Sequence, residues 1–348
     1  VVAHDKSIPL GYFSQTRTAF HIQFLGKQAQ RLRQNFHFLA SSYRDPQLSE
    51  LYIFVIGESS RPQNWGLSGY HRNTTPRLQQ LDNLIFYPNT IAEAALTKIS
   101  VPLILTRKSI RDYIREDFRF SEKSIVSAFQ EAGFSTTWLS NVQTDVFSGE
   151  INQFAQEADR IRFMERRYDS VLLNAYDDVM KSSASKKKLF FVFHTQGSHF
   201  DYEARYPEEF ARYRSPNAAS KKELITDAYD NSIYYTDYFL DQIINRANQF
   251  SGLSSVLYVS DHGENLLDDE RNLLGHFQNN EFDLPTSMLV WVNDLFKKSE
   301  GSLFGSLARN RDLRISTESV FSTLLDLGGV EVPGTDMIKS LSNDNFIE

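Results

Sequence analysis

The chain has no cysteine among its 348 residues. This absence excludes disulfide bonds, zinc sites built on thiolates and a cysteine nucleophile. The sequence also has no apolar run near the length of about 20 residues that a helix needs to cross a bilayer, and no signal peptide opens it. Because the chain begins at Val1 rather than methionine, we expect that a longer protein carries an upstream membrane anchor.

Positive charge is also scarce. The 37 Lys and Arg are outnumbered by 44 Asp and Glu, which gives a formal net charge of -7. Proteins that bind the phosphate backbone of nucleic acids are usually basic, so we expect no nucleic-acid partner. An anionic substrate is not excluded, because a bound metal can supply positive charge locally. The 27 Phe and 16 Tyr are enough for a large hydrophobic core.

The first 45 residues contain one helical pattern. Between residues 18 and 39, apolar residues recur at steps of three and four, at Ile22, Leu25, Ala29, Leu32, Phe36 and Leu39. This spacing places them on one face of a helix. We favour a helix that packs on its own domain; the alternative is a juxtamembrane helix at a lipid surface. We therefore expect residues 1–45 to be a juxtamembrane or linker segment and residues 46–348 to form the main domain.

After residue 46 the pattern becomes that of an alternating α/β protein. Short apolar runs suited to buried parallel strands occupy residues 51–56, 134–139, 189–193, 255–259 and 287–292. Helical patterns occupy residues 122–132, 221–248 and 318–327, the last closed by Gly328-Gly329. This order predicts an α/β fold with a mostly parallel central sheet and helices on both faces. In such sheets, ligands bind beyond the carboxyl ends of the strands.

Metal-binding side chains follow three of the predicted strands. They are Glu58 after the first, His194 and His199 after the strand at 189–193, and Asp261 and His262 after the strand at 255–259. Because the carboxyl ends of parallel strands meet at one edge of a sheet, we expect these groups to lie close together. Carboxylate oxygens and imidazole nitrogens are ordinary zinc ligands, so the sequence predicts a zinc site. The alternative is a turn in which Asp261 caps the next helix.

A candidate nucleophile lies in another segment. Thr97, within Ala-Ala-Leu-Thr-Lys-Ile-Ser-Val-Pro, is predicted at the start of a helix, with Pro102 in the first turn, where a missing N–H is tolerated. The free N–H groups and the positive dipole end at a helix start suit an oxygen that carries a phosphoryl group. Zinc would help such a hydroxyl to ionise near neutral pH. From position alone, Thr97 as a simple N-cap is the stronger interpretation.

The motifs resemble, in order, those of the bacterial phosphoethanolamine transferases. These enzymes belong to the alkaline phosphatase and sulfatase superfamily and include the mobile colistin-resistance enzymes, so the resemblance connects the chain to polymyxin resistance. It extends over roughly residues 51–329 and rests on Ile56-Gly57-Glu58-Ser59, residues 69–76, the Thr97 segment ending in Ser100-Val101-Pro102, residues 194–199, residues 229–232, Ser260-Asp261-His262-Gly263-Glu264 and Gly275-His276. It implies a sulfatase-like fold for the catalytic domain at residues 46–348.

The resemblance also implies a set of site residues. Metal binding falls to Glu58, Thr97, Asp261 and His262, with one zinc ion or two, and Thr97 becomes the residue that carries phosphoethanolamine. His199 and His276 match histidines that bind the phosphate side of the substrate or a second zinc, and that protonate the leaving group. Asn141 matches a substrate-binding region, and His194 is expected to be supportive.

The implied reaction is a two-step exchange at the membrane. Thr97 attacks phosphatidylethanolamine and releases diacylglycerol, after which lipopolysaccharide, lipid A or a periplasmic glucan accepts the group. The expected location is the periplasmic face of the bacterial inner membrane, and the expected state is a monomer. Two departures favour an acceptor other than lipid A: enzymes that modify lipid A usually carry disulfides, and Thr144 and Asp145 replace their lysine-bearing loop.

Three other functions were considered. Particular residues exclude the first of them, and the other two remain as alternatives. A sulfatase needs arginine two residues after the proline of its nucleophile motif, and this chain has Ile104 there. A phosphoglycerol transferase of the lipoteichoic-acid-synthase type belongs to the same superfamily. It would also use a threonine nucleophile, with manganese as the metal and phosphatidylglycerol as the donor. An inactive envelope scaffold would have lost a ligand or the nucleophile, and none of the proposed residues is missing.

Overall fold

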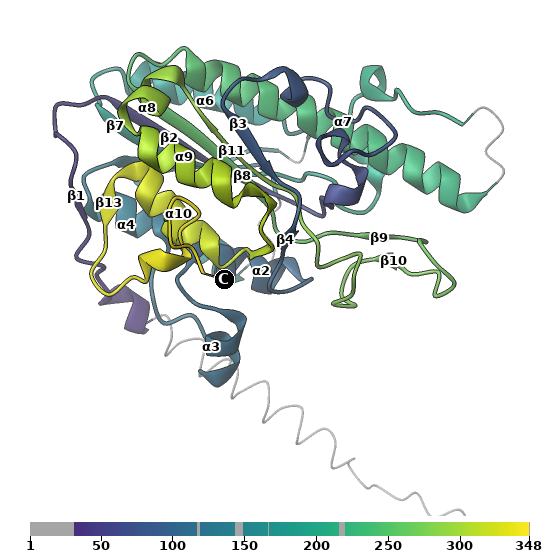
Figure 1. Ribbon diagram of the computed structural model, residues 1–348, viewed down its shortest axis with the longest axis horizontal. Helices are drawn as coiled ribbons and strands as arrows, with labels where there is room; N and C mark the ends of the chain where they lie inside the picture. The colour runs from purple at the N-terminus through teal and green to yellow at the C-terminus, as the bar shows by residue number, and fades with distance from the viewer. Residues whose placement is uncertain (1–30, 117–118, 143–148, 166, 216–219, 348) are drawn as a thin grey trace, which may run out of the picture.

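A seven-stranded sheet lies at the centre of the computed structural model, which describes residues 31–116, 119–142, 149–165, 167–215 and 220–347 (Figure 1). The strand order is β3-β11-β8-β2-β7-β5-β6. Six of these strands run in one direction and β11 opposes them. The strands are β2 (Glu50–Gly57), β3 (Leu84–Tyr87), β5 (Ser135–Ser140), β6 (Arg160–Phe163), β7 (Lys188–His194), β8 (Leu253–Ser260) and β11 (Met288–Val292).

The direction of β11 corrects one prediction. The run at residues 287–292 was expected to be a parallel strand, and it pairs antiparallel with both β8 and β3. A parallel return after β8 would need a crossover connection, usually a helix. Residues 261–287 contain no helix; they form the short hairpin of β9 (Asn265–Leu266) and β10 (Leu274–Gly275) and one isolated bridge from Pro285 to Ile91. The chain therefore re-enters the sheet from the edge at which β8 ended.

Helices cover both faces of the sheet, as predicted (Figure 1). One face carries α2 (Thr97–Leu105), α4 (Ile125–Glu131) and α10 (Ser319–Gly328), and the other carries α6 (Val171–Ser182) and α7 (Lys221–Asn248). The shorter elements are α3 (Ile110–Arg115), α5 (Gly149–Ala155), α8 (Asp294–Ser299), α9 (Gly301–Arg309), β1 (Ser41–Ser42), β4 (Thr90–Ile91), β12 (Ile315–Ser316) and β13 (Val330–Glu331).

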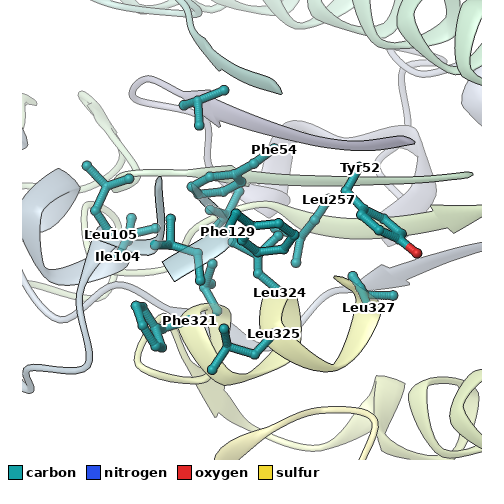
Figure 2. Packing of buried hydrophobic residues seen from close by; sticks show 14 of the residues in the cluster. Tyr52, Phe54, Ile104, Leu105, Phe129, Leu257, Phe321, Leu324, Leu325 and Leu327 are labelled. Atoms are coloured by element: carbon teal, nitrogen blue, oxygen red, sulfur yellow. The ribbon is translucent and has the colours of Figure 1, made fainter. Parts of the chain in front are cut away.

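Strand β2 shows why the strands are apolar throughout. Alternate side chains of a strand point to opposite faces. Tyr52 and Phe54 pack in one core cluster, whereas Ile53 and Val55 pack in the other. Figure 2 shows the first cluster, in which α10 lies against the sheet with Phe129 of α4 between them. A strand with two buried faces needs an unbroken apolar run.

The predicted helices are largely confirmed. Helix α7 has the predicted bounds, and α10 ends at Gly328, followed by the C-cap Gly329, whose φ of 60° closes the helix in the left-handed conformation. Helix α4 is shorter than predicted because Ser124 caps its start by accepting a hydrogen bond from the Val126 N–H. Strands β3 and β6 were not predicted.

The amino-terminal helix lies only partly in the described range. Residues 18–30 of the predicted span fall outside it, and residues 31–34 are helical. The prediction of a helix to Leu39 was wrong at this end, because Leu39 has a φ of 54° and is exposed, while Phe38 is buried in the main core. The domain boundary at residue 46 stays a prediction. Within the described residues, none of the helices combines the length and apolar character needed for a membrane span.

Candidate metal centre

The carboxyl ends of β2 and β8 bring two acidic residues to one edge of the sheet. The strands pair in parallel, with Gly57 opposite Ser260. Glu58 and Asp261 are therefore the first residues beyond the paired strands, and the Asp261 N–H donates to the Gly57 carbonyl at 3.2 Å. Both residues are buried. The sequence prediction that these strand ends meet is confirmed.

Four of the predicted site residues converge here. The Nε2 atom of His262 lies 3.2 Å from Asp261 Oδ2 and 3.5 Å from Glu58 Oε1. The hydroxyl of Thr97 lies 3.1 Å from Glu58 Oε2 and 3.2 Å from the same His262 Nε2. One hydroxyl, two carboxylates and one imidazole nitrogen thus face a common point.

The hydrogen bonds around this point leave lone pairs directed into it. His262 Nδ1 lies 2.8 Å from the Gly263 carbonyl, which can only accept, so Nδ1 carries a proton and Nε2 is the ring nitrogen that can present a lone pair to a metal ion. Asp261 Oδ1 accepts from the N–H groups of Ser59 and His262. Asp261 Oδ2 is buried and accepts no hydrogen bond from the part of the chain that the structure describes. Such an oxygen is costly unless a cation binds it.

The pKa values of Asp261 and Glu58 are shifted in opposite directions. Burial, and then the charge of Glu58, raise the pKa of Asp261 well above its ordinary value. For Glu58, burial opposes ionisation, but coulombic interaction with the imidazoles of His262, His199 and His276 lowers its pKa below the ordinary value. Two buried carboxylates in one site repel each other. A divalent cation would relieve both the repulsion and the burial, and this donor set suits zinc.

Helix α2 fixes Thr97 in this position. Thr97 is the first helical residue and Leu96 is the N-cap, so the predicted place at the helix start is confirmed and the simple N-cap interpretation is wrong. Ser100, one turn on, donates its hydroxyl to the Asp261 carbonyl at 2.5 Å. Pro102 was expected in the first turn, but it lies in the second, where its missing N–H removes a helical hydrogen bond. The helix therefore begins earlier, relative to Pro102, than a first-turn proline would imply.

A second layer of residues surrounds His276. Its Nδ1 lies 3.1 Å from Glu264 Oε2, and Tyr202 donates to Glu264 Oε1 at 2.9 Å. The ring of His276 lies 4.2 Å from that of His262 and 6.1 Å from that of His199, centroid to centroid. Glu264 was quoted in a motif and given no role. Its position beside Asp261 and His262 was the available signal, and it forms with His262 and His276 a second possible metal-binding group.

Asn141 and His194 lie beside the centre rather than in it. The Asn141 side chain is buried and donates to the Arg167 carbonyl at 2.8 Å and to Asp169 Oδ1 at 2.9 Å. Its contact with a substrate stays a prediction. His194 is the last residue of β7, and burial lowers its pKa to about 4, so it is neutral near pH 7. Asp169 was not found from the sequence, and Thr144 and Asp145 lie outside the described residues.

Comparison with known proteins now places this geometry in a family. The sulfatase family model matches residues 50–330. The chain belongs to the sulfatase family. Among curated relatives of this sulfatase-family chain, phosphoethanolamine transferase EptA of Escherichia coli K12 is 28% identical over 298 residues, covering 81% of this chain and 53% of that protein. The chain thus spans about half the length of the curated relatives it matches. The resemblance seen in the motifs is confirmed.

Solved structures of sulfatase-family proteins support the fold. The zinc complex of the periplasmic domain of EcEptC from Escherichia coli has a TM-score of 0.80 at 23% identity, covering 89% of this chain and 90% of that chain. The integral membrane protein EptA from Neisseria meningitidis has a TM-score of 0.78 at 23% identity, covering 96% of this chain and 64% of that chain. The expected alkaline-phosphatase and sulfatase-like fold is therefore confirmed.

Within the sulfatase family, the local geometry separates this chain from sulfate-ester hydrolases. Ser100 occupies the position that a sulfatase motif would use, but it is buried and its hydroxyl bonds the Asp261 carbonyl. Ile104, where that motif needs arginine, is buried in the core. Thr97, one turn earlier, is the hydroxyl that faces the candidate metal ligands.

Proposed function

We propose that this domain transfers phosphoethanolamine from phosphatidylethanolamine to an envelope glycan or lipopolysaccharide, through a covalent intermediate on Thr97. The expected setting is the periplasmic face of the bacterial inner membrane. The observation that carries the proposal is the Thr97 hydroxyl, 3.1 Å from Glu58 and 3.2 Å from His262, in a cluster of buried metal-binding groups. A threonine packed for stability alone would not need acidic and imidazole groups around its hydroxyl.

Glu58, Asp261, His262 and the Thr97 oxygen would hold the zinc ion. When bound, zinc would stabilise the negative charge that develops on the attacking oxygen and on the phosphoryl oxygens. The N–H groups at the start of α2 add positive potential at the same place. Asp261 and Glu58 receive hydrogen bonds from Ser59, through its backbone N–H and its hydroxyl respectively, and these bonds keep the carboxylates oriented.

The first step exchanges one ester bond for another. Thr97 Oγ1 loses its proton and bonds the phosphorus, the bond from phosphorus to the glycerol oxygen breaks, and that oxygen takes a proton as diacylglycerol leaves. His276 and His199 are the proposed binders of the phosphate and proton donors to the leaving group. The contact of His276 Nδ1 with Glu264 leaves its Nε2 available for this role.

The second step returns the enzyme to its starting state. An acceptor hydroxyl or phosphate oxygen bonds the phosphorus, and the bond to Thr97 Oγ1 breaks. Because the donor's product leaves before the acceptor reacts, we expect ping-pong kinetics. The absence of cysteine, and with it of the disulfides usual in enzymes that modify lipid A, favours lipopolysaccharide core or a periplasmic glucan as the acceptor.

Intact-mass analysis tests the proposal. We expect the zinc-loaded wild type, incubated with phosphatidylethanolamine in mixed micelles, to gain the mass of one phosphoethanolamine group. Thr97→Ala should gain none, and phosphatidylglycerol in place of the donor should leave the wild-type mass unchanged. An equal adduct on wild type and Thr97→Ala would remove Thr97 from the mechanism. A phosphoglycerol adduct would instead indicate a phosphoglycerol transferase.

A further inference from the structure

We infer that Asp169 is a positioning residue for Glu58 and His199, although none of its hydrogen bonds reaches either side chain. This inference rests on the proposed metal site. Asp169 lies just before α6 and is 4% exposed. It is far in the sequence from both residues, and no motif in the sequence pointed to it.

The Asp169 carboxylate holds a turn that follows β7. Its Oδ1 accepts from the Gln196 N–H at 2.9 Å, and its Oδ2 accepts from the Gly197 N–H at 3.1 Å. The Asn141 amide donates to Oδ1 as well, at 2.9 Å. Hydrogen bonds to an ionised acceptor are each worth about 1.5–3 kcal/mol. The turn at residues 196–199 is therefore fixed from one side by a single carboxylate.

The same turn is fixed from the other side by the backbone of Glu58. The Ser198 N–H donates to the Glu58 carbonyl at 2.9 Å. Gly197 has a φ of 48°, and a Cβ added there would lie 2.8 Å from both the nitrogen and the carbonyl oxygen of Glu58. Only glycine allows this approach, so the turn and Glu58 pack backbone to backbone.

The turn also carries His199. The His199 N–H donates to the Gln196 carbonyl at 3.2 Å, so the anchoring of Gln196 by Asp169 continues into the residue proposed to bind phosphate. Asn141 belongs to the same network, because Gln196 Nε2 donates to the Asn141 carbonyl at 3.2 Å. The network thus links the ends of β5, β7 and β2, and it fixes the position of Glu58 relative to that of His199. Ligand groups must be held within about 0.5 Å for full function.

Zinc affinity is the decisive measurement. Asp169→Asn removes the charge and replaces one acceptor oxygen with an N–H₂ group. We expect the zinc dissociation constant of the otherwise intact domain, measured by competition with a chromophoric chelator, to rise about 10- to 100-fold, the range for residues that orient metal ligands. The matched control is Asp237→Asn, because Asp237 is also buried and accepts backbone N–H groups, those of Arg77 and Leu78, away from the centre.

The control separates positioning from general stability. Both variants should lower the urea midpoint, but only Asp169→Asn should weaken zinc binding. Equal zinc affinity in Asp169→Asn and wild type would overturn the inference and leave the proposed function standing. A wild type that binds no zinc would instead overturn the proposed function itself.

A second pair of variants tests the link to Glu58 if Asp169→Asn does not fold. Gly197→Ala places a methyl group against the Glu58 backbone, whereas Gly133→Ala has similar backbone strain, at a φ of 89°, with no atom within 4 Å. We expect Gly197→Ala to raise the zinc dissociation constant at least tenfold and Gly133→Ala to leave it unchanged. Equal constants in the two variants would contradict the proposed link.

Discussion

Strand β2 begins at one buried glutamate and is followed by another, and the two have opposite surroundings. At its amino end, Glu50 lies 2.7 Å from Lys188 Nζ and 3.2 Å from an Arg44 nitrogen, and accepts from the Tyr52 hydroxyl at 2.6 Å. At its carboxyl end, Glu58 faces Asp261 and the lone pair of His262. The chain neutralises the first glutamate with its own cations and leaves the second in an acidic cluster.

This difference separates a structural charge network from a binding site. Buried charges are tolerated when a partner of opposite charge is present. Arg44 meets that condition, since it also pairs with Glu300 at 2.9 Å. Asp261 Oδ2 does not, because it accepts no hydrogen bond from the described residues and the nitrogen nearest to it, His262 Nε2 at 3.2 Å, is itself a candidate metal ligand. An unbalanced, buried acidic cluster at the carboxyl edge of a sheet is the arrangement expected of a site that binds a cation.

The largest expected effect is on activity at the carboxyl edge. Asp261→Asn should lower the rate of adduct formation on Thr97 about 10³-fold, because losing a metal ligand removes several kcal/mol of charge stabilisation. The metal-free variant should be no less stable than the metal-free wild type, because the change removes repulsion from Glu58. Mass analysis over time and urea unfolding measure the two quantities. If Asp261→Asn kept an activity within tenfold of wild type, the acidic cluster at the carboxyl end of β2 would not be the proposed metal site.

The next effect is on stability at the amino edge. Glu50→Gln leaves Arg44 and Lys188 without their buried carboxylate, so we expect a loss of about 3–5 kcal/mol in the free energy of unfolding. Zinc affinity should not change, because these residues lie at the opposite end of β2. Urea unfolding and chelator competition test both statements. A weaker zinc site in Glu50→Gln would show that the two edges are coupled.

The smallest expected effect is a pH dependence of stability, which comes from the buried His194 at the carboxyl end of β7. Burial lowers the pKa of His194 from 6.5 to about 4, so between these values the unfolded chain binds a proton that the folded domain does not. The stabilising contribution of neutral His194 is therefore present above pH 6.5 and is lost as the pH falls toward 4, by at most about 1.4 kcal/mol per pH unit.

His194→Gln provides the control for this titration. The difference in unfolding free energy between wild type and His194→Gln, both metal-free, should narrow from pH 7 to pH 5. A difference that stays constant with pH would show that His194 is not buried in its neutral form.

Much of the fold followed from apolar runs and their ends. The strands at 51–56, 189–193 and 255–259 were predicted because a strand buried on both faces needs a continuous apolar run, and the polar residue after each run marked the edge of the sheet. Strands β3 and β6 are shorter, and their sequences gave no clear period. The direction of β11 depended on the path of residues 261–287, which no local pattern encodes.

Some residues of the candidate site could likewise be predicted from the sequence, and others could not. Glu58, Asp261 and His262 were found because they are the first or second residues after a strand. Asp169 and the role of Glu264 were missed, because both act through hydrogen bonds to groups distant in the sequence. Asn141 was predicted to lie in a substrate-binding region, which stays a prediction, and its side-chain amide donates to Asp169 and to the Arg167 carbonyl.

The amino-acid sequence alone determined which residue types lie at the carboxyl ends of the strands, since local hydrophobicity places each strand and the next residue must leave the core. Only the tertiary structure decided that the Thr97 hydroxyl lies beside Glu58 and His262, and that Asp261 Oδ2 is buried and accepts no hydrogen bond from the described residues. These facts depend on the packing of α2 against β8 and on the hydrogen bond from His262 to the Gly263 carbonyl. Such contacts join residues far apart in the chain, and their geometry is fixed only when the core closes around them.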